Sequence, residues 1–193
     1  MKKVTALLIC LILSLSFCGC KEKKESKVEG ADIEYYANVG QIPESEIRLS
    51  NDPDKVLSKL RENQNSSGLE SHDSDEEGEQ AEIPVIETGD YSEIAGENFQ
   101  YYYKTADKNS GITAITATAA AFGYEPDTVI IEIEADLDSK KIKYETKSGN
   151  FSDYYFFSFS ADPCEFLICE FDKNTVVFAF TQSKLCAAAV YAK

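Results

Sequence analysis

The alternation of apolar and polar positions predicts that the second half of the chain is mostly antiparallel sheet. Runs of alternating or aromatic residues end at turn-forming segments such as Asp172–Asn174 and Gln182–Lys184, and connections this short join neighbouring antiparallel strands. The runs predict strands at residues 99–104, 112–121, 154–160, 165–171, 175–181 and 185–192.

One segment in the first half has the spacing of an amphipathic helix. Ser50–Asp54 is a polar cluster with an early proline, which is typical of a helix start. Val56, Leu57 and Leu60 follow it on one helical face. We therefore predict a helix over residues 53–63.

Residues 127–137 fit two structures. Their alternation favours a strand, whereas the apolar stripe from Val129 to Leu137 favours a helix. An internal repeat favours the helix, because Asp52–Leu57 and Glu125–Ile130 are similar in sequence and lie 73 residues apart.

A second short match, between Asp107–Asn109 and Asp172–Asn174, is also explained by a tandem duplication, with chance similarity as the alternative. We predict an α+β fold with a predominantly antiparallel sheet and one or two short helices, arranged as two tandem α/β units if the repeat is genuine. A helix followed by antiparallel strands, repeated at this length, resembles the tandem units of beta-lactamase inhibitor proteins and of small outer-membrane assembly lipoproteins. Those families bind other proteins with their sheets, so the resemblance implies a protein-binding role, although their Gly and Gly-x-Pro signposts are missing here.

The start of the chain is typical of an export signal. Lys2 and Lys3 precede Val4–Phe17, an uncharged apolar run that is shorter than a stable membrane span. Charge returns immediately afterwards at Lys21. We therefore expect the protein to be exported.

The end of this signal, Phe17-Cys18-Gly19-Cys20, resembles the lipobox of bacterial lipoprotein precursors, with Phe17 where leucine is usual. The resemblance implies that Cys20 receives a diacylglycerol and that the chain is cut just before it. Two acyl chains are enough to hold a protein on a membrane, here on the cell-surface or envelope side. An ordinary secretory signal or an uncleaved anchor is the alternative.

Acidic residues dominate the middle of the chain. The net charge is −15, and residues 62–93 contain eleven Asp or Glu and no Lys or Arg. Nucleic acid is not an expected partner, because an acidic chain is repelled by phosphate backbones. The predicted organisation is a signal peptide at 1–19, a lipidated tether at 20–30, an N-terminal part of the domain with its short helix at 31–63, an acidic disordered loop at 64–93 and a sheet domain at 94–193.

The sequence offers little catalytic chemistry. The single histidine, His72, lies in the acidic loop, so a Ser-His or Cys-His dyad is not expected in the folded part. Asp73–Glu79 is similar to the start of a calcium loop, but Pro84 occupies the position of the bidentate glutamate, which favours a solvated loop. The remaining cysteines are Cys164, Cys169 and Cys186. They either form one disulfide and leave one free thiol, or are three buried thiols.

Paired carboxylates can hydrolyse sugars, but the sequence does not fix a pair. The carboxylates considered for this role are Asp153, Asp162, Glu165, Glu170 and Asp172. We predict no catalytic residue, no metal and no cofactor.

Tyrosines are the remaining candidates for function. Tyr101–Tyr103 are consecutive on a predicted strand, and Tyr154 and Tyr155 precede two phenylalanines on another, so rings point to both faces of the sheet. Either helices cover the second face, or it is an exposed aromatic surface, which often marks a binding site. The candidate binding surface consists of Tyr101, Tyr103, Tyr154 and Tyr155. The function predicted is noncatalytic binding of a protein or glycan at the cell surface or envelope; a structural or assembly component of the envelope is the alternative, and a hydrolase ranks third.

Overall fold

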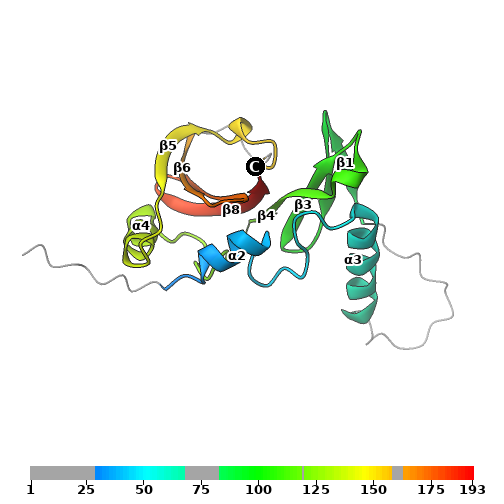
Figure 1. Ribbon diagram of the computed structural model, residues 1–193, viewed down its shortest axis with the longest axis horizontal. Coiled ribbons are helices and arrows are strands. Elements are labelled where there is room, and N and C mark those ends of the chain that lie inside the picture. The colour runs from blue at the N-terminus through cyan, green and yellow to red at the C-terminus, as the bar shows by residue number, and fades with distance from the viewer. Residues whose placement is uncertain (1–28, 68–82, 119, 158–162) are drawn as a thin grey trace, which may run out of the picture.

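The computed structural model describes residues 29–67, 83–118, 120–157 and 163–193, and an eight-stranded sheet forms the centre of this part (Figure 1). Neighbouring strands are antiparallel throughout. The predicted α+β class with a predominantly antiparallel sheet is confirmed. The strands are β1 (Val85–Thr88), β2 (Tyr91–Ala95), β3 (Phe99–Lys104), β4 (Ile112–Ala117), β5 (Glu145–Asn150), β6 (Pro163–Glu170), β7 (Asn174–Thr181) and β8 (Lys184–Ala192), in the sheet order β1-β2-β3-β4-β8-β7-β6-β5.

The sheet consists of two four-stranded meanders, each preceded by a helix. α3 (Pro53–Ser67) leads into β1–β4, and α4 (Ile130–Ser139) leads into β5–β8. The last strand of each meander, β4 and β8, pair with each other at the centre of the sheet. This is the element order of two tandem α/β units.

The two short sequence matches fit this arrangement unequally. Pro53 is the first residue of α3 and Pro126 lies just before α4, so the helical match occupies similar places in the two units. The turn match does not, because Asp107–Asn109 lies between β3 and β4 whereas Asp172–Asn174 lies at the connection of β6 to β7.

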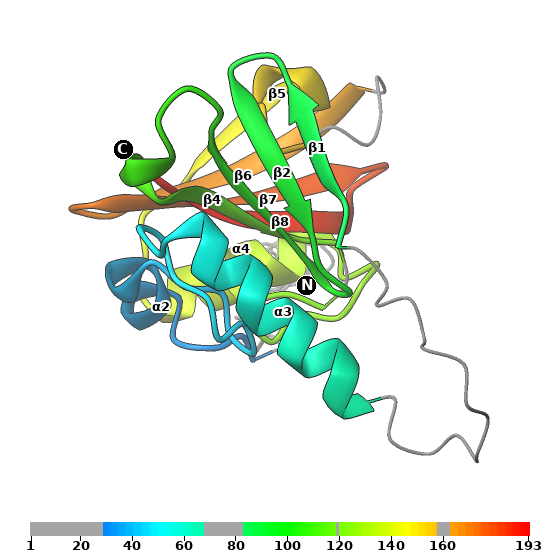
Figure 2. The ribbon, with the colours of Figure 1, turned by 90° about the vertical axis from the view of Figure 1, so that its right-hand side faces the viewer.

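The α-helices of the described part lie on one face of the sheet (Figure 2). α4 turns Ile133 and Leu137 into the core and leaves Ile131 61 % exposed. The helix favoured for residues 127–137 is thus confirmed, although it begins at Ile130 and ends at Ser139. Burial of one large apolar side chain contributes roughly 1.5–3 kcal/mol. Strand residues in the core beneath the helices include Ile94, Tyr101, Tyr103, Ile115, Leu167, Cys169, Val176, Phe178, Phe180, Leu185 and Val190.

The opposite face is covered by an aromatic segment, residues 151–157, and not by α-helices. The β5–β8 half of the sheet curls around this segment (Figure 1). Phe157 stacks on Phe166 of β6 with ring centroids 6.1 Å apart, and Thr116 Oγ1 of β4 donates a hydrogen bond to the Phe156 carbonyl at 3.0 Å. Small side chains on the strands leave room for the rings: Ala114, Ala179, Ala187 and Ala189.

Part of the predicted acidic loop is structured, so its boundaries are corrected. α3 continues to Ser67, and β1 and β2 form a hairpin through the two-residue turn Gly89–Asp90, in which Gly89 has a φ of +64°. A Gly-Asp pair between alternating residues favours this tight turn. Residues 68–82, which contain His72 and the calcium-like segment, lie outside the described residues.

The predicted strand at residues 154–160 is wrong over its described part. Asn150 and Asp153 form a capping box, in which the Asn150 N–H donates to Asp153 Oδ2 at 3.1 Å, and this starts the short 3₁₀ helix η2 (Phe151–Asp153). Residues 154–157 continue without strand structure. Local capping thus outweighs the strand preference of the aromatic run.

Two further elements were not predicted. α2 (Ile33–Val39) begins where Asp32 Oδ1 accepts a hydrogen bond from the Tyr35 N–H at 3.0 Å, and it ends at Gly40 with a φ of +67°. β5 is an edge strand with no apolar alternation to reveal it. Within the described ranges, the structure has no helix that is both long and apolar enough to span a membrane.

Candidate functional site

The four tyrosines predicted to form a binding surface do not share one. Tyr101 and Tyr103 point to the helix face and are 3 % and 4 % exposed, whereas Tyr154 and Tyr155 are half-buried on the opposite face. Tyr155 stacks on Tyr91 of β2 with ring centroids 3.7 Å apart, so it helps to hold the aromatic cover in place. The predicted surface is therefore wrong, but Tyr101 reaches a cavity.

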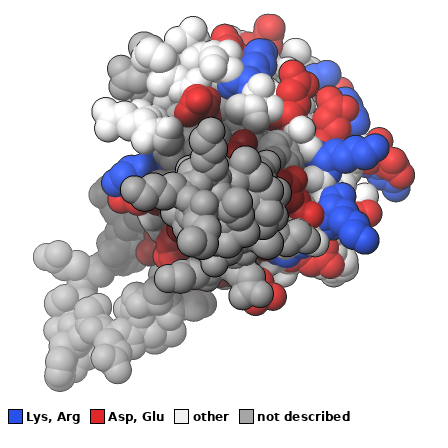
Figure 3. Space-filling view, turned by 90° about the vertical axis from the view of Figure 1, so that its left-hand side faces the viewer, with Lys and Arg blue, Asp and Glu red and all other residues white. Residues whose placement is uncertain are grey.

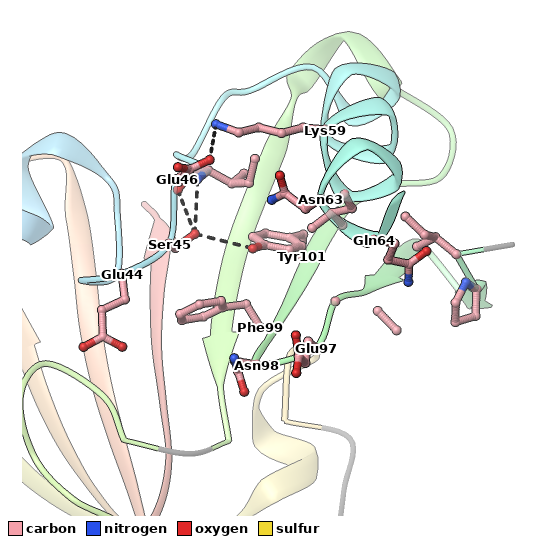
Figure 4. A pocket seen from close by; sticks show the side chains of 16 residues that line it. Glu44, Ser45, Glu46, Lys59, Asn63, Gln64, Glu97, Asn98, Phe99 and Tyr101 are labelled. Carbon is pink, nitrogen blue, oxygen red and sulfur yellow. Dashed lines mark hydrogen bonds and ion pairs between the residues drawn. The ribbon is translucent and has the colours of Figure 1, made fainter. Parts of the chain in front are cut away.

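This cavity, of about 530 Å³, opens where three segments meet beside Tyr101 (Figure 4). One wall is the loop of residues 44–47 that follows α2, and a second is α3. The third is the β2–β3 turn together with Ile83 and Pro84, which precede β1. Phe99 and Tyr101 on β3 supply its aromatic surface.

Local hydrogen bonds set the shape of the loop. Ser45 is 2 % exposed, and its Oγ accepts from the Ile47 N–H and donates to the Ile47 carbonyl, both at 3.2 Å. Lys59 of α3 forms an ion pair with Glu46 at 2.7 Å, joining the loop to the helix. The Lys59 side chain is 40 % exposed and that of Glu46 67 %, so this pair contributes at most about 1 kcal/mol and mainly positions the loop.

Tyr101 brings a buried hydroxyl to the cavity. Among the described residues its hydrogen-bond partner is Ser45 Oγ at 3.5 Å, which is long for a bond between hydroxyls. Burial raises the pKa of Tyr101; the Ser45 hydrogen bond opposes this shift and the charge of Glu46 adds to it. The phenol is therefore neutral at physiological pH and keeps hydrogen-bonding capacity for a ligand.

The cavity rim is acidic and rich in amides. Glu44, Glu46 and Glu97 line it, against a single lysine, Lys59. The α4 and β5 end of the molecule differs, because basic side chains are interspersed with Asp and Glu there (Figure 3). Carboxylates beside aromatic rings suit cations and hydroxyl-rich ligands. Amide side chains complete the rim: Asn63, Gln64 and Asn98.

The three cysteines in the described part are free thiols, and none lines the cavity. Cys169 and Cys186 lie on β6 and β8 with β7 between them, which places them too far apart for a disulfide. Burial raises the pKa of Cys169 to about 12 and that of Cys164 to about 11, the latter with small additions from neighbouring charges. Both are protonated at neutral pH, which does not favour a nucleophilic role.

Three of the carboxylates considered for sugar hydrolysis have structural partners. Asp153 caps η2, Glu165 accepts a hydrogen bond from Ser183 at 3.4 Å, and Glu170 pairs with Lys193 at 3.2 Å. Asp172 lies in the β6–β7 connection, and Asp162 lies outside the described residues. Among the side chains that the structure describes, no group of three or more His, Cys, Asp or Glu is placed to hold a metal ion.

Sequence reasoning missed the cavity because its walls come from distant segments. Ser45 and Glu97 are separated by α3, β1 and β2 in the chain, and no local motif links them. Phe99 and Tyr101 were visible as strand aromatics, but their role depends on what packs above them. Phe17, Cys18, Gly19 and Cys20 lie outside the described residues, so the lipobox stays a prediction.

Comparison with known proteins finds no matching protein family, no similar sequence among curated proteins and no similar solved structure. The functional argument therefore depends on the chemistry of the site itself.

Proposed function

We propose that the protein is an exported lipoprotein, anchored through lipid on Cys20, whose sheet domain binds a protein or a glycan without catalysing a reaction. The cavity beside Tyr101 carries the binding part of the proposal. Its volume of about 530 Å³ lies within the roughly 300–1,000 Å³ common for ligand sites. It also combines an aromatic surface with polar groups from three segments, as recognition of a shaped ligand requires.

The site chemistry supports binding rather than turnover. The Tyr101 phenol is kept protonated by burial, and the rim carboxylates Glu44, Glu46 and Glu97 are exposed. Groups in these states donate and accept hydrogen bonds but are not activated nucleophiles.

Cross-linking in living cells tests the binding proposal. A photoreactive amino acid in place of Gln64, an exposed rim residue, should form adducts with the ligand, whereas the same group at Thr146, exposed on β5, should not. Glu97→Lys should reduce the Gln64 adducts by reversing a rim charge. Glu145→Lys, an equally exposed change on β5, should leave them intact.

Glycan ligands need a separate assay, because carbohydrates photo-label poorly in cells. The mature chain, residues 20–193 with Cys20→Ser, should be applied to an array of surface glycans, with the Glu97→Lys variant beside it. Loss of both readouts, with no adducts at position 64 and no glycan bound, would refute a binding function at this cavity.

Detergent-phase partitioning tests the anchor independently. The wild-type chain expressed in a bacterium should enter the detergent phase, and Cys20→Ala should stay aqueous or uncut. Equal partitioning of the two would show that Cys20 carries no lipid.

A further inference from the structure

β1 leaves one edge of the sheet without a strand partner among the described residues. It is the outermost strand, and its four residues are all exposed. The Ala95 N–H donates to the Pro84 carbonyl at 3.2 Å, so Pro84 and Ala95 are a hydrogen-bonded pair of the β1–β2 ladder. Because bonded and nonbonded pairs alternate in antiparallel sheets, Val85 and Glu87 direct their backbone N–H and C=O groups outward.

The side chains of this edge favour a docked strand. Val85 is 42 % exposed and Ile86 is 48 % exposed, on opposite faces of the strand. The other edge of the sheet, β5, is polar and contains Lys147 and Gly149. Lysines and polar residues protect an edge from pairing, so the two edges differ in their capacity to accept a strand.

The open edge leads directly to the cavity. Ile83 and Pro84 line the cavity and immediately precede β1. Val85 is paired with Ile94, a residue of the helix-face core, so Val85 lies on the same face of the sheet as the cavity. One side chain of an added strand would therefore cover Val85. Another side chain of that strand, two residues away and on the same face of the sheet, would point toward the cavity.

Charge identifies the kind of strand that fits. The β1–β2 hairpin contains Glu87, Asp90 and Glu93 and no Lys or Arg. Three glutamates also line the cavity against one lysine. A second copy of this chain, with a net charge of −15, would bring the same acidic residues, whereas a basic segment is attracted.

We propose that β1 binds an extended, basic segment of a partner protein, which adds a strand to the sheet and places a Lys or Arg side chain in the cavity beside Tyr101. The cation would meet the rim carboxylates and the aromatic surface of Phe99 and Tyr101. This inference rests on the proposed binding function and selects a protein over a glycan as the ligand.

Selection from a random 12-residue peptide library, displayed on phage, tests the proposal with the mature Cys20→Ser chain as target. The enriched peptides should alternate Lys or Arg with β-branched residues. Glu87→Pro removes one outward N–H while keeping the bonds of β1 to β2. It should therefore weaken the best peptide by up to about tenfold, the upper end of what one lost backbone hydrogen bond contributes. Glu87→Gln, which keeps that N–H, serves as the matched control and should weaken binding less.

The cavity has its own test. Glu97→Lys should weaken the same peptide about tenfold through like-charge repulsion. A peptide whose basic residues are replaced by Gln should lose affinity for the wild type and lose its sensitivity to Glu97→Lys. Fluorescence anisotropy measures each affinity, and circular dichroism checks that every variant is folded.

Four outcomes would overturn the proposal. The first is that the selected peptides lack basic residues, and the second is that Glu87→Pro and Glu87→Gln bind the best peptide with equal affinity. The third is that Glu97→Lys does not change the affinity for that peptide. The fourth is that the chain forms a dimer that Glu87→Pro dissociates, which would identify a second copy as the occupant. If glycan binding or the adducts at position 64 persist while peptide binding fails, the proposed function stands and strand addition alone is refuted.

Discussion

Replacing Asp136 with alanine should destabilise the domain where α4 meets the first described residues of the chain. The Asp136 carboxylate is buried, and its Oδ2 accepts three hydrogen bonds. Tyr124 Oη donates at 2.6 Å, Lys140 Nζ at 2.8 Å and the Gly30 N–H at 3.1 Å. One oxygen thus joins α4, the segment before it and the first described residues of the chain.

The magnitude follows from what the substitution leaves behind. Tyr124 is fully buried, and without Asp136 its hydroxyl loses a bond to a charged group that contributes about 1.5–3 kcal/mol. Lys140 loses its ion pair but still donates to the carbonyls of Gly30 and Ala31, at 2.6 and 3.2 Å. Breaking a fully buried charged pair costs about 3–5 kcal/mol, but the Lys140 side chain is 26 % exposed and water takes up part of this cost. The retained bonds of Lys140 place Asp136→Ala near the lower end of that range.

Urea and thermal denaturation of the mature Cys20→Ser chain would measure this loss. For a domain of this size, about 3 kcal/mol corresponds to a fall in Tm of roughly 6–12 °C. Asp138→Ala is the matched control, because Asp138 is exposed on the same helix and its loss should change stability by about 0.5 kcal/mol or less. The reasoning fails if Asp136→Ala unfolds within about 1 kcal/mol of the wild type, since the cost of breaking a buried pair would then be absent.

Three further predictions concern backbone strain, thiols and pH. Gly111→Ala should lower the free energy of unfolding by more than about 1–3 kcal/mol, because Gly111 has a φ of +71° and a Cβ would lie 2.6 Å from the backbone of Ser50. Gly89 has a φ of +64° but nothing lies within 4 Å of a Cβ there, so Gly89→Ala should lower the free energy of unfolding less in the same denaturation assay. Ellman titration of the denatured, unreduced Cys20→Ser chain should give three thiols, and a lower count would contradict the free state of its cysteines. The contribution of Cys169 to the free energy of unfolding should be complete below about pH 9 and be lost as pH rises toward 12. Burial raises the pKa of Cys169 from 9.0 to about 12, so the unfolded chain loses that proton first. Urea denaturation at pH 7.5 and 10.5 measures the resulting fall, which should be smaller in Cys169→Ala.

The strands that the sequence predicted correctly are those with strong local signals. β3, β4, β6, β7 and β8 combine alternation or aromatic density with short turns, although β4 ends at Ala117 and not at residue 121. The helix was favoured over a strand for residues 127–137, and Ile130, Ile133 and Leu137 of the predicted stripe form the buried face of α4. Periodicity is informative where one face of an element is buried and the other is not.

The elements that escaped prediction lack such periodicity or lie within misleading composition. β1 is exposed along its whole length, so no apolar alternation marks it, and the acidic residues around it favour a loop. β5 is equally exposed at the other edge and is held through its pairing with β6. Edge strands of this kind depend on a neighbour that is distant in sequence or on a turn such as Gly89–Asp90.

The candidate site was less predictable than the fold because burial decides it. Tyr101 and Tyr102 are adjacent on β3 and both are at least 97 % buried, on opposite faces, so consecutive tyrosines did not signal an exposed surface. Only the packing of α3 and the loop around Ser45 leaves an opening beside one of them. A one-residue difference in register would exchange their environments.

The aromatic cover over the second face has a consequence for where a partner docks. Helices occupy one face of the sheet, and residues 151–157 occupy the concave part of the other, held by the Tyr91–Tyr155 stack and by the hydrogen bond of Tyr155 to Thr113 at 3.1 Å. A sheet whose faces are filled by its own chain has its edges and the gaps between covering elements left for recognition. β1 and the cavity beside Tyr101 supply one of each, and they adjoin at Pro84. Strand addition at β1 therefore requires no displacement of the core, whereas binding on either face would first have to remove several buried aromatic side chains, each stabilised by roughly 1.5–3 kcal/mol.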